Sequence, residues 1–301
     1  MKRFVVKIAF LFLIIACADF VIGQGLEYMT SQIKVGGQGR DNYIVNETTE
    51  EILIFGSSRA IHHYNAKMIE DSLGLTCYNC GENGSGIILS YGRLLMIEER
   101  HKPQIIIQDI TPNCDIITND NHRYLGWLKA HYEKVYLHPI FEDIDKKEKF
   151  KMKSYLYRYN SRCIQTVVTY LSGKANDDGV NGFRPLKEKF DKMKLREEKN
   201  NNNYEVDQLK IDYINHFIDL ANGVQLVFVV SPVWYGMDST QLNPIRKICN
   251  ERGILFWDFS NNPKYVHRDE FFKDGMHMNA EGADEFTNDL IECLKKMSIH
   301  L

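Results

Sequence analysis

The stretch Glu51-Ile-Leu-Ile-Phe-Gly-Ser-Ser-Arg59 decides the fold class. Its apolar residues form a short unbroken run that ends at Gly56, which is typical of a buried β-strand. A strand that is apolar on both faces belongs in a parallel sheet covered by helices on both sides. Residues 60–73 then carry apolar side chains at helical spacing, so the stretch opens a strand–turn–helix unit.

The same pattern recurs on both sides of a long middle segment. Further strands are predicted at residues 76–79, 104–110, 225–230 and 254–259, and helices at 87–100, 206–221, 242–252 and 283–297. Strands that alternate with helices in this way predict an α/β domain with one parallel sheet.

The composition bounds the class of protein. The chain has 301 residues, with 37 basic and 40 acidic side chains and a formal net charge of −3. This balance excludes the strongly basic surface that nucleic-acid binding requires. Hydrophobic residues make up 44% and aromatic residues 12% of the chain, which excludes a largely disordered protein.

The seven cysteines are scattered over the chain, which argues against a disulfide framework. Cys77 and Cys80 form a C-x-x-C pair, but no second pair or histidine partner follows at the spacing of a zinc site. We therefore expect ordinary buried thiols and no metal centre.

Residues 1–22 have the pattern of an export signal or membrane anchor. Lys2, Arg3 and Lys7 precede the apolar run Ile8–Ile22, in which Asp19 is the only charge. Counted from Phe4, the 19 residues to Ile22 are just long enough to span a bilayer. The positive-inside rule then places the rest of the chain outside the cytoplasm, as in a single-pass cell-membrane protein. Two alternatives stay open, lipidation at Cys17 and cleavage near Ala16 to Ala18.

The segments around the α/β pattern have different compositions. Residues 23–50 are polar and contain Gly36-Gly-Gln-Gly39, which predicts a stalk leading to a domain over residues 51–301. Residues 115–205 interrupt the pattern and are predicted to form a helical insertion. It includes a helix over Tyr155–Leu171 and a loop at Asn200–Asn203.

The turn after the first strand is a candidate site. Ligands of open parallel sheets bind at the carboxyl ends of the strands, where Ser57 and Ser58 lie. The amides of the following helix could stabilise an oxyanion there. The alternative is that one of the two serines only caps the helix.

Asp274-Gly-Met-His277 adds the partners that such a serine needs. In a turn, the Asp274 carboxylate can accept a hydrogen bond from His277 Nδ1, which leaves Nε2 free to take a hydroxyl proton. A lone Asp-x-x-His can also be a metal-ligand fragment, but no third ligand of matching spacing follows.

At this point the sequence resembles the SGNH/GDSL hydrolase superfamily. The family's first block, Gly-Asp-Ser, is matched by Gly56-Ser-Ser58, and its last, Asp-x-x-His, by Asp274 and His277. Its second block is similar to Asn79-Cys-Gly-Glu-Asn-Gly84. Ser57 stands in place of the usual Asp, as in the D-alanyl transfer proteins of teichoic acid modification.

The resemblance implies a flavodoxin-like three-layer α/β/α fold with Ser58, Asp274 and His277 as catalytic residues. It also implies that the amides of Ser58 and Gly84 form the oxyanion hole. The third family block, Gly-x-Asn-Asp, is not matched, and Asn113 is the candidate for its missing donor.

The resemblance implies an extracytoplasmic esterase or O-acyltransferase that uses no cofactor. Its substrate would be an acylated glycan of a bacterial cell envelope or a small ester, and a membrane-bound O-acyltransferase could be its partner. Arg59 and Trp234 are the candidate substrate contacts. The alternative is a catalytically silent SGNH-fold protein for envelope binding or assembly, in which Ser58 and His277 would lie out of hydrogen-bond reach.

Overall fold

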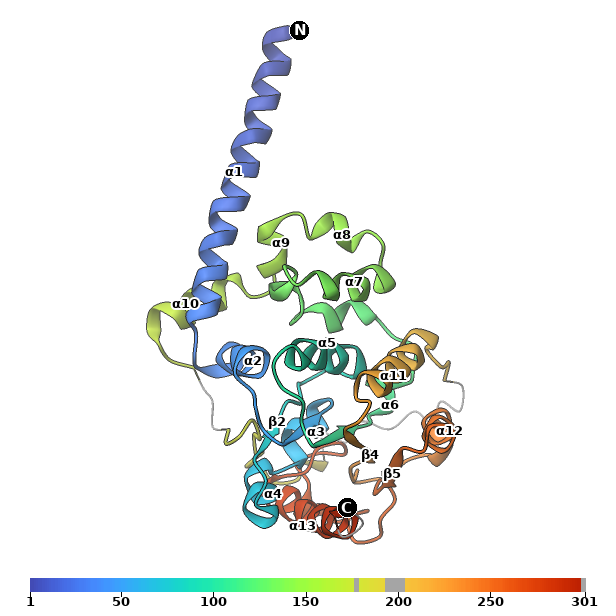
Figure 1. Ribbon diagram of the computed structural model, residues 1–301. Helices are drawn as coiled ribbons and strands as arrows, with labels where there is room; N and C mark the ends of the chain where they lie inside the picture. The colour runs from blue at the N-terminus through green and yellow to red at the C-terminus, as the bar shows by residue number, and fades with distance from the viewer. Residues whose placement is uncertain (176–178, 193–203, 299–301) are drawn as a thin grey trace. The chain divides into compact units, whose positions relative to one another are not determined.

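The computed structural model describes residues 1–175, 179–192 and 204–298 (Figure 1). The chain divides into two compact units. The helical unit comprises residues 1–45 and the described part of 121–177. The sheet unit comprises residues 46–120 and the described residues from 179 onward.

The sheet unit is built on a parallel sheet that has, in the described residues, five strands in the order β2-β1-β3-β4-β5. The strands are β1 (Ile52–Phe55), β2 (Cys77–Asn79), β3 (Ile105–Asp109), β4 (Gln225–Val230) and β5 (Leu255–Asp258). In the register, Ile54 lies beside Asn79 of β2 and Ile107 of β3. This strand order is the flavodoxin-like one, so the predicted α/β fold class is confirmed.

Helices cover both faces of the sheet (Figure 1). They are α3 (Ser58–His63), α4 (Ala66–Leu73), α5 (Ile87–Glu98), α6 (Pro112–Asp115), α11 (Gln208–Leu220), α12 (Asn243–Arg252) and α13 (Ala280–Ser298), with 3₁₀ helices η5 (Ser239–Leu242) and η6 (Asp269–Phe271). Ile52 and Ile54 share a core cluster with Phe286 and Leu290 of α13. On the other face, the rings of Phe55 and Phe217 of α11 lie 5.8 Å apart. Alternate residues of a strand therefore point to opposite faces of the sheet and pack against different helices.

The predicted helix over residues 60–73 is divided into α3 and α4. The Asn65 side chain accepts a hydrogen bond from Met68 N at 3.3 Å and so caps α4. Between the helices, Tyr64 is buried, and its hydroxyl donates to Asp109 at 2.6 Å. A continuous helix through Tyr64 would lose both contacts, which is why the chain breaks there.

The helical unit holds the N-terminal helix and most of the insertion. Its helices are α1 (Lys2–Gln32), α2 (Gly36–Asn46), α7 (His138–Ile144), α8 (Glu148–Lys151), α9 (Tyr155–Tyr159) and α10 (Cys163–Ser172), with 3₁₀ helices η1 (Asn121–Leu125), η2 (Lys129–His131) and η3 (Val135–Leu137). α1 is long and apolar enough to cross a membrane, and its apolar part is not buried against the protein. It is thus compatible with a signal anchor or a signal sequence.

Most of residues 23–50, predicted as a stalk, is helical. α1 continues to Gln32, and α2 begins at Gly36. The glycines here serve close packing. A Cβ atom on Gly23 would lie 2.2 Å from Tyr155 Cβ, and one on Gly39 would lie 2.2 Å from the carbonyl carbon of Lys34.

The insertion differs from its predicted bounds of 115–205. Residues 121–175 group with the N-terminal helices, whereas 115–120 and 179–192 belong to the sheet unit. The predicted helix Tyr155–Leu171 is divided into α9 and α10. The tract Asn200–Asn203 lies outside the described residues. The cysteines are free thiols, with Cys77, Cys80, Cys114 and Cys249 buried as expected.

Candidate active site

The turn after β1 separates the roles of the two serines. Gly56 has a φ of 139°, and a Cβ atom there would lie 2.8 Å from Asp109 O, so the turn requires glycine. Ser57 is the N-cap of α3, and its hydroxyl accepts from Arg59 N at 3.3 Å. Ser58 is the first helical residue, and its amide donates no hydrogen bond within the described residues. Ser57 therefore does the capping, which leaves Ser58 available for chemistry.

Ser58, His277 and Asp274 form a continuous hydrogen-bonded chain. Ser58 Oγ lies 2.8 Å from His277 Nε2. On the other side of the ring, His277 Nδ1 lies 3.0 Å and 3.1 Å from the two Asp274 oxygens. With Nδ1–H donating to the carboxylate, Nε2 carries the lone pair that can accept the Ser58 proton.

Asp274 stays ionised in this setting. Burial opposes its charge, but the hydrogen bond and charge of His277 and the amides of Met276 and His277 outweigh that effect and lower the pKa of Asp274 to about 2. The carboxylate is thus available over a wide pH range to orient the His277 ring.

His63 and Trp234 hold the segment that carries His277. His63 Nε2 accepts from Met278 N at 3.0 Å, and its Nδ1 lies 3.0 Å from Ser231 Oγ. Burial, aided by the charges of Arg59 and His277, lowers the pKa of His63 well below its usual value, so the ring is neutral and Nδ1–H is the donor. The Trp234 amide donates to Gly275 O at 3.1 Å. Sequence analysis assigned neither residue this role, since the partners come from distant segments.

A buried polar network lies beneath Ser58. Ser57 Oγ and Thr111 Oγ1 are 2.7 Å apart, and Thr111 Oγ1 donates to Asp109 at 3.3 Å. Arg59, expected to contact substrate, belongs to this network: it is 1% exposed and donates through Nε to Ser231 Oγ at 3.0 Å. Its guanidinium also lies 3.8 Å from Asp109. The structure thus corrects the Arg59 expectation, because burial directs its donors into the protein.

The loop after β2 lies directly beside the Ser58 turn. Glu82 N donates to Gly56 O at 2.9 Å. A Cβ atom on Gly81 would lie 2.6 Å from Ala60 Cβ, so this loop approaches α3 closely. Gly84 has a φ of 68° and faces open space, and its amide donates to no described acceptor. The Gly84 and Ser58 amides are therefore both available to a ligand.

Asn113 lies on α6, in a segment that meets the same loop. A Cβ atom on Gly86 would lie 2.5 Å from Cys114 O, which shows how closely the two segments approach. Asn113 is exposed, and its carbonyl accepts from Lys210 Nζ at 3.2 Å. Its side chain forms no hydrogen bond to Ser58, Gly84 or His277.

His62 is a site residue that the sequence analysis did not single out as functional. Its ring centroid lies 6.0 Å from that of His277. Nδ1–H donates to Arg184 O at 2.6 Å, and Nε2 lies 3.0 Å from Asn83 Oδ1. Burial is the main cause that lowers the pKa of His62. The signal in the sequence was its position one helical turn after Ser58.

Trp234 is half-buried, and its ring stacks on Phe190 with 5.1 Å between centroids. Its indole N–H donates to Asp269 at 2.9 Å. Phe190 comes from residues 179–192, a segment in which Leu186 O also accepts from Ala280 N. This segment therefore runs beside the His277 loop, and Trp234 stays a candidate for an aromatic wall.

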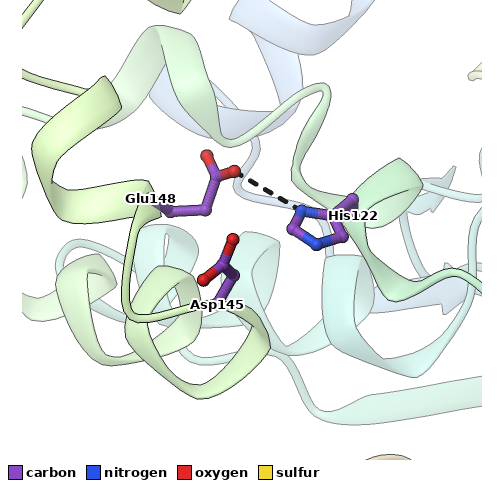
Figure 2. A group of neighbouring side chains, drawn as sticks. All are labelled: His122, Asp145 and Glu148. Carbon is purple, nitrogen blue, oxygen red and sulfur yellow. Dashed lines mark ion pairs between the residues drawn. The ribbon is translucent and has the colours of Figure 1, made fainter.

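A second cluster of titratable groups lies in the helical unit, where His122, Asp145 and Glu148 gather (Figure 2). His122 Nδ1 lies 3.4 Å from Glu148, which is 1% exposed. Lys151 Nζ lies 2.6 Å from Glu148 and 3.6 Å from Asp145. Because the Lys151 ammonium pairs with both carboxylates, the cluster is an ion-pair network.

The chain can be compared with known proteins by its sequence and by its structure. No family model and no curated protein sequence matches the chain. Among solved structures, one from Streptococcus pneumoniae, provisionally described as a platelet activating factor, is similar to it with 11% identity and a TM-score of 0.38. The match covers 97% of this chain and 99% of that chain. A likeness of this size carries no argument about activity.

Proposed function

We propose that this chain is an SGNH-type serine hydrolase that acts outside the cytoplasm, either as an esterase or as an O-acyltransferase. The proposal rests on one observation, the hydrogen-bonded chain from Ser58 Oγ through the His277 ring to Asp274, with 2.8 Å between Ser58 Oγ and His277 Nε2. This distance favours an enzyme over the catalytically silent alternative, which expected the two atoms out of reach.

In the first half of the reaction, Ser58 Oγ attacks the ester carbonyl carbon while its proton moves to His277 Nε2. Asp274 stabilises the imidazolium that forms. The negative charge on the former carbonyl oxygen would be held by the amides of Ser58 and Gly84, with the Asn113 side chain as a further candidate donor. His277 then gives the proton to the departing alcohol, which leaves an acyl group on Ser58.

In the second half, His277 takes a proton from water or from an acceptor hydroxyl, which attacks the acyl-enzyme. Release of the acyl group then returns the proton to Ser58 Oγ. Water as acceptor makes the protein an esterase, and a glycan hydroxyl makes it a transferase. A cell-envelope glycan fits a catalytic unit that an N-terminal apolar helix would tether to a membrane, and a membrane-bound O-acyltransferase is the proposed acyl donor system.

The test is covalent labelling of the full chain with a fluorophosphonate, followed by mass spectrometry of the modified residue. An activated Ser58 forms a bond to phosphorus and expels fluoride, so we expect the label on Ser58. Ser58→Ala should remove it, and His277→Ala should slow it by about 10²-fold or more, since the general base is lost.

Ser57→Ala is the matched control. Ser57 is 1% exposed, caps α3 and bonds to Thr111, so this variant should keep the label and lose about 1–3 kcal/mol of stability. No label on folded wild-type protein, or an unchanged label in Ser58→Ala, would refute the proposed nucleophile.

A further inference from the structure

α10 has its polarity reversed relative to a helix that packs on a water-soluble protein. Ile164, Val168 and Leu171 share one face and are 78%, 58% and 74% exposed. The threonines Thr166 and Thr169 are turned inward and are 4% and 9% exposed. A helix that buries its polar side chains and exposes a stripe of branched apolar ones indicates an apolar medium outside it.

The contacts of α1 fix where this medium lies. Asp19 accepts from Ser154 Oγ, Tyr155 N and Leu156 N at the start of α9, and the Tyr28 ring lies 6.3 Å from that of Tyr170 in α10. Asp19 comes three residues before the end of the apolar run at Ile22, about 5 Å at the rise of an α-helix. If α1 spans a bilayer, α9 therefore lies at the border of the hydrocarbon. Tyr28 comes six residues after Ile22, about 9 Å along the helix, so α10 lies at the level of the lipid headgroups.

The charge of the same segment fits an anionic surface. Between Lys146 and Lys174 there are eight basic residues and one acidic residue, in a chain whose net charge is −3. On α8, the Phe150 side chain is 60% exposed and lies between the ammonium groups of Lys149 and Lys153, at 5.7 Å and 5.3 Å from its ring. Aromatic rings flanked by lysines are typical of segments that bind the membrane interface.

We propose that the helical unit is a membrane-interface module that docks on an anionic bilayer. The stripe Ile164, Val168 and Leu171 enters the boundary between headgroups and acyl chains, and exposed basic side chains of the segment, Lys153 among them, contact lipid phosphates. This position also accounts for Asp19, because its carboxylate accepts from Ser154 and from the first two amides of α9 at the edge of the membrane. This inference does not depend on the chemistry of Ser58.

The test uses the full chain reconstituted in phosphatidylcholine vesicles with or without phosphatidylglycerol. Single nitroxide labels are placed at Ile164→Cys, Val168→Cys and Leu171→Cys, with the accessible native Cys17, Cys163 and Cys293 replaced by serine. Collision rates with oxygen, which concentrates in lipid, and with a water-soluble nickel complex report the surroundings of each label. Leu255→Cys is the control, because Leu255 is also an exposed apolar residue, at 43%, but lies on the sheet.

We expect oxygen to dominate at the three stripe positions and nickel to dominate at Leu255→Cys, with a several-fold difference in their ratio. Omitting phosphatidylglycerol, or introducing Lys149→Glu with Lys153→Glu, should lower the ratio at the stripe. Nickel-dominated collisions at all three positions would overturn the proposal, and so would protection from both reagents, which indicates a protein partner or second copy. Equal ratios in the two lipid mixtures would overturn its electrostatic part.

Discussion

At the scale of single residues, the candidate site depends on hydrogen bonds that fix protonation. His277 can act as a base only if Nδ1 keeps its proton and Nε2 keeps its lone pair. Asp274 enforces this because it accepts from Nδ1 through both oxygens. The same carboxylate also accepts from two amides of its own turn, so it is held in place before any substrate binds.

Asp274→Asn is therefore expected to keep the fold and lose activity. The amide can donate to His277 Nδ1, which would favour the tautomer with the proton on Nε2 and block proton transfer from Ser58. We expect the rate of fluorophosphonate labelling to fall on the order of 10³–10⁴-fold, with unchanged circular dichroism. Labelling within about tenfold of wild type would show that the carboxylate does not set the tautomer.

His63 makes stability depend on pH. Its pKa in the folded chain is far below the unfolded value of 6.5, so the unfolded chain binds more protons in acid. The contribution of His63 to the free energy of unfolding is therefore complete above about pH 6.5. It is lost as the pH falls below that value, by up to about 1.4 kcal/mol per pH unit. Denaturant unfolding of the full chain in neutral detergent should show this slope.

The matched variant for this effect is His63→Gln, whose amide can accept from Met278 N and donate to Ser231 without titrating. We expect a shallower dependence of the unfolding free energy on pH below about 6.5, with His62 supplying the remainder, since burial lowers its pKa too. An unchanged slope in His63→Gln would contradict the assignment.

Single residues could be assigned from the sequence only where their partners are local. Asp274 and His277 are three residues apart in one turn, and Ser58 follows a strand end, so each could be placed by its motif. Arg59 could not, because its burial depends on Ser231, which is 172 residues away. His63 was missed for the same reason, since its partners Ser231 and Met278 are 168 and 215 residues away in the sequence.

At the scale of elements, the loop after β2 shows how backbone conformation prepares a site. Gly84 and Gly74 have φ values of 68° and 70°, and a Cβ atom on either would meet nothing within 4 Å. Alanine at each position thus carries the same backbone strain, about 1–2 kcal/mol, without a steric clash. Only Gly84 lies in the loop beside Ser58.

We accordingly expect Gly84→Ala and Gly74→Ala to lower stability equally and to differ in activity. Relaxation of the strained loop would displace the Gly84 amide, and a shift of about 1 Å at a reacting group costs about 10²-fold. Ester turnover should therefore fall ten- to a hundredfold in Gly84→Ala and stay near wild type in Gly74→Ala. Equal activities would remove Gly84 from the oxyanion hole.

The strands were predictable as elements, and helix ends were less so. β1 and the first three residues of β3 are short apolar runs rich in isoleucine and buried on both faces, and their shortness and β-branched residues favour a strand over a helix. The division between α3 and α4 was hidden, because Ile61, Met68 and Ile69 keep helical spacing across it. What breaks the helix is the cap at Asn65 and the bond from Tyr64 to Asp109, and the second is a tertiary contact.

At the scale of the whole molecule, the first helix belongs to the same compact unit as α9 and α10, which follow it by more than a hundred residues. The sequence predicted a stalk there because its glycines and polar residues are typical of linkers. Gly23 and Gly39 instead allow close backbone approach, and Leu26 and Thr30 of α1 are buried at 4% and 6% exposure. Composition alone could not distinguish these two uses of glycine.

A chain that begins at Lys34 should weaken the helical unit and leave the sheet unit folded. It lacks Asp19, Leu26 and Thr30, so the first two amides of α9 lose their carboxylate acceptor and α10 loses part of its support, at a cost of about 1 kcal/mol or more. The N-cap of α9, Ser154, remains. We expect hydrogen exchange over residues 154–172 to become about tenfold faster or more. Labelling of Ser58 should persist, because the sheet unit keeps its own core.

Undiminished protection of residues 154–172 in the shortened chain would contradict this view of the helical unit. Loss of Ser58 labelling would show that the sheet unit needs the N-terminal helix in order to fold. Hydrogen exchange resolved by peptide reports the protection of residues 154–172 and of the sheet unit in one measurement, since the two regions fall in different peptides.

The contact between Asp19 and the start of α9 also has a consequence for biosynthesis. The carboxylate and the first of its partners are 135 residues apart, so at 5–20 residues per second about 7–27 seconds pass between their emergence from the ribosome. During that interval an acidic group near one end of an apolar helix has no partner, and it is best satisfied at the water-facing border of the bilayer. Asp19 would thus hold the newly synthesised α1 at a fixed depth until the residues that bond to its carboxylate have been made.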